Sequence, residues 1–211
     1  MKRLGLARSL EDPLCQTVRA AGWEPVPCFL TTLEPTLTPP PCEHPDAVLL
    51  LSPAAARHAL LPAGVPCLAQ GQATARILDG HPVWVSATPK AEGLFELLKQ
   101  RFPQGGTFLV ARAERSRAYL ETAAAGTPWT LLPWITHRER PLEPLPPMPE
   151  VTAVLALSPL QAELLGPLAG LRFAWGQRTQ RAFAQVGYPC QGWCEPEAAA
   201  LERLLIPQAN S

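Results

Sequence analysis

Apolar and polar positions follow one another along the chain in blocks that predict strands and then helices. Two apolar runs, Ala47 to Pro53 and Ala153 to Pro159, each end in Ser-Pro, and an Ala/Leu-rich helical stretch follows each run. Continuous apolar runs are typical of parallel strands that helices cover on both faces. The regular alternation therefore predicts an α/β fold with doubly wound, parallel sheets.

The chain also repeats itself. The motif Gly-Gln-Ala-Thr at residues 71–74 returns 105 residues later as Gly-Gln-Arg-Thr at residues 176–179, and the surrounding pattern of strands and helices returns with it. A second block, Arg3 to Pro35, matches Thr107 to Pro141. This internal repeat predicts two copies of one half, in the order A-B-A-B.

The two A blocks predict matching elements. In the first block we expect a strand over Arg3 to Ala7, a helix that Ser9 caps and that runs to Gly22, and a strand over Pro25 to Thr31. In the second block we expect a strand over Thr107 to Ala111, a helix over Glu114 to Ala125, and a strand over Trp129 to Ile135.

Two proline-rich segments, residues 32–45 and 136–150, show no periodicity, and we interpret them as interdomain linkers. The junction at residues 101–106 is short and turn-like, as within a compact domain. These lengths predict a discontinuous first domain, residues 1–34 plus 147–211, and a second domain, residues 42–138, joined by a two-segment hinge. A plain tandem of two continuous domains is the alternative.

Composition restricts the expected partners. In 211 residues, 18 Lys and Arg balance 18 Asp and Glu, so no overall positive field would attract nucleic acid or an anionic membrane. No apolar stretch reaches the roughly 18 to 20 residues of a spanning helix, and no signal-peptide core is present, so we expect a cytoplasmic protein. Six scattered cysteines without Cys-x-x-Cys spacing indicate small hydrophobic side chains rather than a metal site.

Repeated polar residues fall where the predicted strands end, which is where open parallel sheets bind ligands. These residues are Ser52, Ser158, Arg8, Arg112 and the members of the two helix-opening motifs: Gly71, Gln72, Thr74, Gly176, Gln177 and Thr179. Glycine lets the backbone approach a ligand, and unpaired N–H groups at a helix start suit a carboxylate or phosphate. Two such helix ends facing each other across a hinge would form a cleft lined with anion-binding groups.

Each of these residues also has a structural interpretation. Thr74 and Thr179 could cap or pack their helices, and the two serines could be N-caps before the prolines that follow them. A dinucleotide-binding fold is not indicated, because Ala69 stands where the glycine-rich fingerprint needs its first glycine. The sequence contains neither a P-loop nor a Gly-x-Ser-x-Gly nucleophile motif.

The order of these motifs resembles that of the uroporphyrinogen-III synthase family over nearly the whole chain. The resemblance rests on Ala7-Arg8, on Leu51-Ser52 and Leu157-Ser158, on the two Gly-x-x-Thr motifs, and on Leu132-Pro133-Trp134. It implies two flavodoxin-like domains joined by two strands. It also implies a cofactor-independent lyase that closes the linear tetrapyrrole hydroxymethylbilane into uroporphyrinogen III, with inversion of ring D and loss of water.

The resemblance also assigns roles by position. Thr179 becomes the main candidate for catalysis, and Ser52, Ser158, Thr74 and Arg8 would contact the eight carboxylates of the substrate.

Trp134 is the second catalytic candidate by position, and it departs from the family pattern. The family usually has a tyrosine here, thought to assist loss of the hydroxyl, whereas an indole N–H has no titratable proton. A non-catalytic relative that binds a tetrapyrrole or another anion is therefore the alternative. We expect a monomer, because no heptad pattern or apolar surface stripe is evident.

Overall fold

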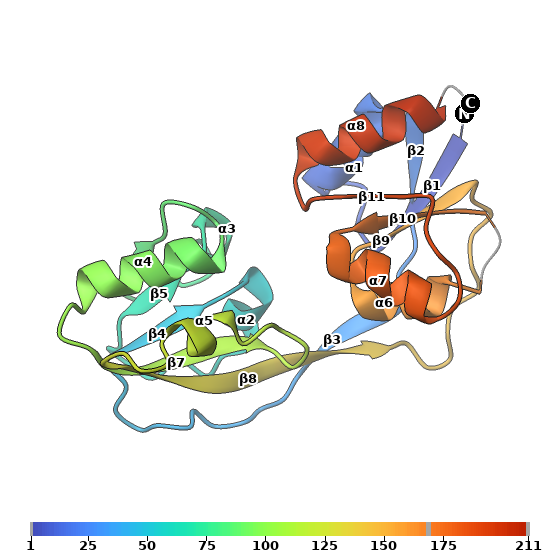
Figure 1. Ribbon diagram of the computed structural model, residues 1–211. Coiled ribbons are helices and arrows are strands. Elements are labelled where there is room, and N and C mark those ends of the chain that lie inside the picture. Colours follow the sequence, from blue (N-terminus) through green and yellow to red (C-terminus); the bar gives the residue numbers. More distant parts are fainter. Residues whose placement is uncertain (1, 168–169, 210–211) are drawn as a thin grey trace. The chain divides into compact units, whose positions relative to one another are not determined.

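The computed structural model describes residues 2–167 and 170–209 and divides the chain into two compact units (Figure 1). Unit 1 consists of Met1–Thr32 and Arg140–Ser211, and unit 2 consists of Leu33–Glu139. One unit is therefore built from both ends of the chain, whereas the other is continuous. Both are α/β, with sheets dominated by parallel pairing, as the sequence predicts.

Unit 1 contains a five-stranded sheet in the order β11-β10-β9-β1-β2, and every neighbouring pair in it is parallel. Its strands are β1 (Lys2–Leu6), β2 (Trp23–Pro27), β9 (Ala153–Ala156), β10 (Leu171–Trp175) and β11 (Gly192–Cys194). Its helices are α1 (Pro13–Ala20), α6 (Pro159–Leu165), α7 (Gln177–Gln185) and α8 (Ala198–Ala209).

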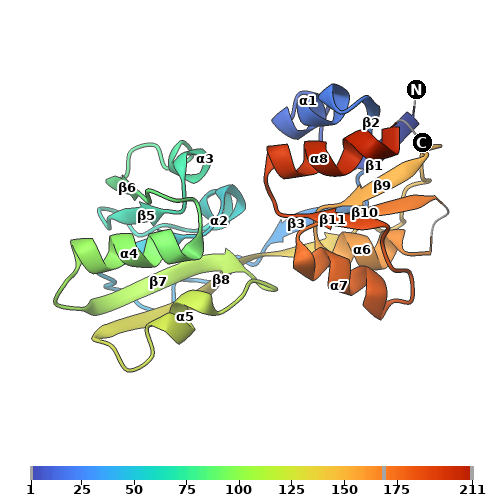
Figure 2. The same ribbon diagram turned by 45° about the horizontal axis from the view of Figure 1, so that its top comes forward.

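Helices cover both faces of this sheet (Figure 2). Successive strand residues point to opposite faces, so Leu155 of β9 packs in the core under α1 and α8, while Val154 and Ala156 pack in the core under α6 and α7. All four residues of β9 are buried, which confirms the doubly covered strand that the apolar run predicts.

Trp23 joins the two ends of the chain within unit 1. It is fully buried, its indole Nε1 donates to the Leu205 carbonyl at 3.1 Å, and its ring meets Phe173 edge to face at 6.2 Å between centroids. An unpaired indole N–H in this core would carry the full cost of its desolvation, so the bond to α8 fixes the ring.

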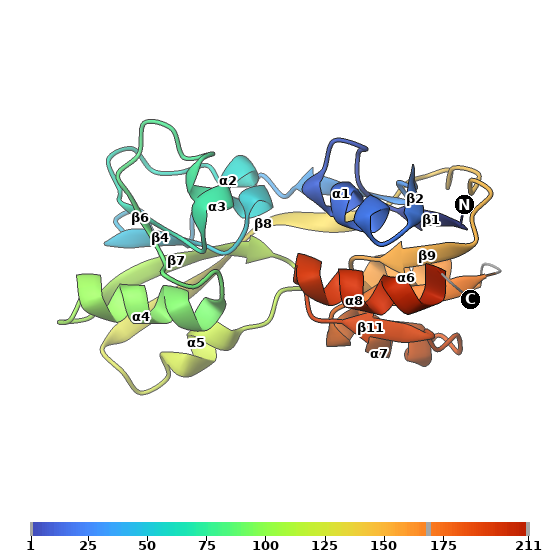
Figure 3. The same ribbon diagram turned by 90° about the horizontal axis from the view of Figure 1, so that it is seen from above.

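Unit 2 contains a six-stranded sheet in the order β3-β8-β7-β4-β5-β6. Its strands are β3 (Thr31–Pro35), β4 (Ala47–Leu50), β5 (Cys67–Ala69), β6 (Val83–Val85), β7 (Gly106–Ala113) and β8 (Trp129–Pro141). The first two residues of β3 and the last two of β8 belong to unit 1. Its helices are α2 (Pro53–His58), α3 (Gln72–Ala75), α4 (Ala91–Arg101) and α5 (Tyr119–Ala123). Helices α4 and α5 cover one face, and α2 and α3 cover the other (Figure 3).

The proline-rich segments are more ordered than the sequence indicates. β3 begins the first segment, and β8, which the sequence predicts to end at Ile135, runs to Pro141 in the second. Thr36 N donates to Thr136 O at 3.0 Å and Leu142 N donates to Leu30 O at 2.8 Å, so the two segments run antiparallel. Prolines fit here because β3 is an edge strand and Pro35 and Pro141 are terminal residues.

Two predicted helices are shorter than expected. Asp12 rather than Ser9 caps α1, because its carboxylate accepts from Leu14 N at 2.8 Å and Pro13 takes the first helical position. The helix expected over residues 114–125 is reduced to α5. Glu114 N instead donates to His137 O at 3.0 Å, so the chain beyond β7 continues alongside β8 before it can turn into a helix.

Replacing Trp23 with phenylalanine should weaken unit 1 specifically. The substitution removes the donor to Leu205 O, and we expect the free energy of unfolding to fall by about 1–3 kcal/mol. Urea unfolding followed by circular dichroism measures it. Trp193→Phe, at a side chain that is 37% exposed, is the matched control and should change stability by less than about 0.5 kcal/mol. Equal effects of the two variants would contradict the assigned role of Trp23.

Candidate functional site

The predicted polar residues lie at the carboxyl ends of adjacent strands in each sheet. In unit 1, Arg8, Ser158 and Gly176 follow the neighbouring strands β1, β9 and β10. In unit 2, Ser52 and Gly71 follow the neighbouring strands β4 and β5, and Arg112 lies near the end of β7. Each sheet edge thus carries an arginine, a serine and a glycine in the same spatial order.

The strand register aligns these residues further. Leu50 of β4 pairs with Ala69 of β5, and continuing that register by two residues places Ser52 level with Gly71. Ala156 of β9 pairs with Ala174 of β10, which places Ser158 level with Gly176 in the same way. Because parallel strands end at one edge, each serine lies beside the start of the next helix.

The two glycines are required by backbone conformation. Gly71 has a φ of 131° and Gly176 a φ of 95°, in the region that L side chains rarely adopt. A Cβ at Gly71 would also meet Pro89 Cβ at 3.3 Å, and one at Gly176 would meet Pro196 Cγ at 3.5 Å. The residues that follow, Gln72 and Gln177, are exposed.

The two serines cap helices, as their structural interpretation requires. Ser52 Oγ accepts from Ala55 N at 3.1 Å, and Ser158 Oγ accepts from Gln161 N at 3.2 Å. A proline follows each serine at the first helical position. Accepting a hydrogen bond does not use the hydroxyl proton, so capping by itself is compatible with ligand binding, although Ser158 has a further contact within the protein.

The two motif threonines are core residues. Thr74 and Thr179 are each 2% exposed, and Thr179 Oγ1 donates to the Trp175 carbonyl at 3.0 Å. This places both on the packed side of their helices, where they hold the helix start against the sheet. Direct contact with a substrate would require these side chains to become exposed.

The two arginines differ in their surroundings. Arg8 has a side chain 43% exposed and lies 3.3 Å from Asp12, so its guanidinium borders solvent. The Arg112 side chain is 11% exposed, donates to Glu121 at 2.9 Å and also donates to Ser116 O. Arg112 therefore stabilises the turn between β7 and α5, while Arg8 remains accessible to solvent beside Asp12.

Trp134 is part of the core of unit 2. It is 1% exposed, and its Nε1 donates to Thr38 O at 2.9 Å, which ties β8 to the segment that enters the unit. The indole N–H is committed to this bond and has no acidic proton to release. The geometry favours a structural role for Trp134 over the catalytic one expected from its position.

Sequence reasoning missed a buried glutamine beside Ser158. Gln161 is 7% exposed, its Oε1 accepts from Leu157 N at 3.0 Å, and its Nε2 lies 3.3 Å from Thr31 Oγ1. It thereby joins the end of β9 to the first residue of β3. Nothing in the sequence indicated that Gln161 is buried, because a glutamine in the first turn of a helix is usually exposed.

Sequence reasoning also missed a pair of histidines in unit 2, because they share no spacing. His58 ends α2 and His137 lies on β8, with their ring centroids 5.6 Å apart. His137 is 3% exposed, and its Nδ1 lies 3.0 Å from Thr136 Oγ1. Burial, and secondly the neighbouring His58, lowers the pKa of His137 from its ordinary value.

All six cysteines are free thiols. Burial raises the pKa of Cys28, Cys67 and Cys194 to about 11, so these three thiols stay protonated at neutral pH and are not activated for chemistry. Within residues 2–167 and 170–209, no three His, Cys, Asp or Glu side chains gather closely enough to hold a metal ion. Over the same ranges, none of the helices combines the length and apolar character needed to cross a membrane.

Parallel sheets covered on both faces, with polar and glycine-bearing strand ends, define this chain as an α/β protein suited to small-molecule binding. Residues 4–140, more than half of the chain, match the family model described as uroporphyrinogen-III synthase HemD. The chain therefore belongs to the uroporphyrinogen-III synthase family, as the motif order implies. A search of curated proteins found no matching relative.

Solved structures show the same fold. Uroporphyrinogen-III synthetase from Helicobacter pylori aligns over 99% of this chain and 100% of its own, with a TM-score of 0.65 and 15% identity. A mutant uroporphyrinogen III synthase from Thermus thermophilus aligns over 100% of this chain and 99% of its own, with a TM-score of 0.54 and 18% identity. At such identities the likeness establishes the fold.

Replacing Thr179 with valine should destabilise unit 1, because the isosteric side chain leaves the Trp175 carbonyl without its donor. We expect the free energy of unfolding to fall by about 1 kcal/mol, measured by urea titration. Thr179→Ser keeps the hydroxyl and should stay closer to the parent protein. If valine left stability unchanged, the packing role assigned to Thr179 would be wrong.

The histidine pair should make unit 2 sensitive to acid. The lowered pKa of His137 means that the folded state disfavours the charged form of this side chain. The neutral imidazole therefore contributes its full stabilisation above a pH of about 6.5. As the pH falls below this value, the unfolded chain binds a proton that the folded unit resists, and stability declines.

Thermal unfolding between pH 7.5 and pH 5 tests this sensitivity. His137→Gln should flatten the decline, and His58→Gln should reduce it by removing the neighbouring charge. The exposed His44→Gln is the control and should leave the profile unchanged. A profile of the His137 variant that follows the parent protein would count against the pair.

Proposed function

We propose that this protein is a uroporphyrinogen-III synthase, a lyase that closes hydroxymethylbilane into uroporphyrinogen III with inversion of ring D and loss of water. The observation that carries the proposal is the family match over residues 4–140. The fold likeness over 99–100% of the chain supports it. The repeated arginine, serine and glycine at the strand ends supply groups that an eight-carboxylate substrate needs.

In the proposed reaction the main role of the protein is to position the substrate. Loss of the substrate hydroxyl as water gives a reactive azafulvene, which the far ring attacks through a spiro intermediate before the ring closes. The substrate is intrinsically reactive, so holding its ends in the geometry that leads to inversion is the main contribution. Arg8, Ser52, Ser158 and the half-buried backbone at Gly71 and Gly176 would bind its carboxylates.

The leaving hydroxyl needs a proton, and in this proposal it comes from a group other than Trp134. The buried indole, bonded to Thr38 O, cannot supply one. We also propose that no metal or organic cofactor takes part, and that the protein acts in the cytoplasm as a monomer.

Two further parts of the proposal concern architecture. The sheet orders β2-β1-β9-β10-β11 and β8-β7-β4-β5-β6 place the A and B strands in the same succession, which supports two flavodoxin-like halves from one internal repeat. The paired segments β3 and β8 support a two-segment hinge, through which the protein would adjust to its substrate.

The buried Trp134 favours a second candidate function. A family member that kept the fold but lost the tyrosine at this position would bind a tetrapyrrole, or another multivalent anion, without accelerating its closure. Binding without turnover separates this candidate from the first.

An isomer assay tests the proposed function. Purified protein is given freshly generated hydroxymethylbilane, the products are oxidised, and the type I and type III uroporphyrin isomers are resolved. We expect type III to dominate, because unaided closure yields type I. Substituting both capping serines, Ser52→Ala and Ser158→Ala, should lower the rate of type III formation roughly tenfold if each hydroxyl contributes one charge-assisted hydrogen bond.

Trp134→Tyr serves as a companion variant. A rise in type III formation would show that the position still borders the reaction, whereas unchanged rates fit its structural role. If the folded parent protein yields type I alone, the catalytic proposal fails and the binding relative takes its place.

A further inference from the structure

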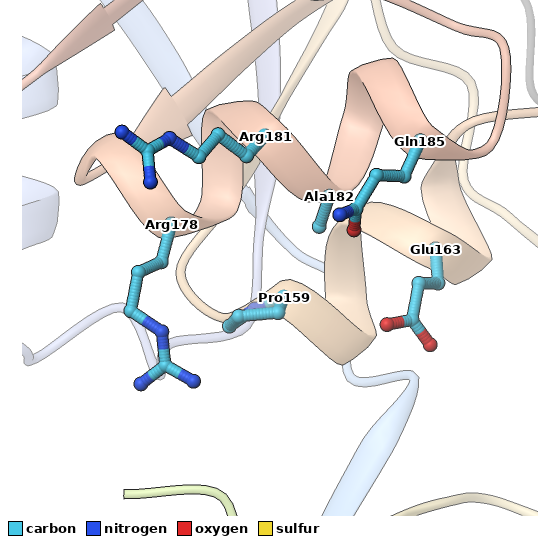
Figure 4. Close-up of a pocket in the computed structure, with 6 residues that line it drawn as sticks. All are labelled: Pro159, Glu163, Arg178, Arg181, Ala182 and Gln185. Carbon is cyan, nitrogen blue, oxygen red and sulfur yellow. The ribbon is translucent and has the colours of Figure 1, made fainter. Parts of the chain in front are cut away.

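A hollow of about 260 Å³ lies between α6 and α7 of unit 1 (Figure 4). It is lined by Pro159, Glu163, Arg178, Arg181, Ala182 and Gln185. Ala182 is 3% exposed and forms part of the packed interface between the two helices. The hollow therefore combines an apolar floor with polar walls, which is the usual composition of a small-molecule site.

The charges of the hollow are separated along its length. Arg178 and Arg181 are three residues apart on α7, so they share one side of the helix. Figure 4 shows their guanidinium groups toward one end, with Glu163 and Gln185 toward the other. Arginine presents paired N–H donors that fit a carboxylate, and two arginines together favour an anion at that end.

The opposite end suits a hydrogen-bond donor. An ionised glutamate only accepts, so Glu163 is complementary to an N–H group, while Gln185 can donate or accept. A pyrrole ring with acidic arms has this combination, with carboxylates on its carbon atoms and an N–H on the ring. The volume is below the range of roughly 300–1,000 Å³ that encloses a drug-sized ligand, so a single ring fits better than a macrocycle.

The sequence places this hollow directly beside the candidate site. Pro159 follows Ser158, and Arg178 is the third residue of the Gly-Gln-Arg-Thr motif. The corresponding motif of unit 2 has Ala73 at that position. A general feature of the fold would occur in both halves. The arginine pair occurs in only one of them.

We propose that this hollow is a subsite for one carboxylate-bearing pyrrole ring of the substrate, with Arg178 and Arg181 binding the acidic arms and Glu163 accepting from the ring N–H. The inference rests on the proposed function for the identity of the ligand and extends it to side chains outside the strand-end motifs. Arg178 and Glu163 also have contacts within the protein, so the ligand exchanges these contacts for its own.

Binding of uroporphyrin III, which carries eight carboxylates, tests the subsite without requiring turnover. Arg178→Gln together with Arg181→Gln should raise the Kd roughly tenfold in calorimetric titrations at moderate salt. Arg178→Lys with Arg181→Lys keeps the charge but loses the paired donors, and should fall between the parent protein and the glutamine variant. Arg203→Gln with Arg19→Gln removes two exposed arginine side chains elsewhere in unit 1 and is the matched control.

The outcomes separate this inference from the proposed function. Weaker binding in the Arg178/Arg181 variant alone supports the subsite, even if the parent protein forms only the type I isomer. An equal loss in the control would show general charge attraction and overturn it. Unchanged binding in the Arg178/Arg181 variant would also overturn it, even in a protein that forms type III. A thermal melt of each variant confirms that the fold is retained.

Discussion

The parallel pairing of β1 with β9 is the constraint on which the architecture depends. Leu4 pairs with Ala153 and Leu6 with Leu155, so the first strand of the chain lies beside one that follows about 150 residues later. The segment β1-α1-β2 supplies a helix to one face only, and the helices of the opposite face, α6 and α7, come from the segment that begins with β9. The pairing makes a single sheet of both segments and forces the chain to leave unit 1 and return.

The entropic cost of closing the long segment between β1 and β9 is reduced, because the chain leaves unit 1 and returns to it through two paired strands. β3 and β8 are neighbours, and the bonds from Thr36 to Thr136 and from Leu142 to Leu30 bring the two crossing segments together. Closure entropy depends on the flexible length that remains. Once unit 2 is folded, that length is only the few residues between this ladder and the strands of unit 1.

The sequence predicted the fold best where local pattern and burial agree. The apolar runs at β4 and β9 are entirely buried, as expected for strands covered on both faces. The sequence pattern did not reveal β3 or the extension of β8 to Pro141, because proline is excluded from central strands but tolerated in an edge strand and at a strand end. It failed at α5 because a backbone bond from Glu114 to His137 extends the region of β7, and no local pattern reveals that partner.

The candidate site was predictable in its backbone and less so in its side chains. Positive φ at Gly71 and Gly176 follows from a glycine that opens a helix, and the Ser-Pro pairs are N-caps by residue type. Burial of Thr179 depends on which side of α7 faces the sheet. The ion pair of Arg112 depends on Glu121, nine residues further along the chain. Such facts arise from packing, which residue order alone does not specify.

Comparing the two halves shows how packing separates equivalent positions. Arg8 and Arg112 match in the sequence repeat, and each pairs with a carboxylate, but Arg8 meets Asp12 at the surface while Arg112 and Glu121 are both largely buried. A ligand must compete with a carboxylate at both positions, but solvent weakens the exposed Arg8–Asp12 pair, whereas the Arg112–Glu121 pair is largely buried. The free energy of binding a ligand at the equivalent sheet edge is therefore expected to differ between the two units. We therefore expect the exposed Arg8 to be the better anion contact of the pair.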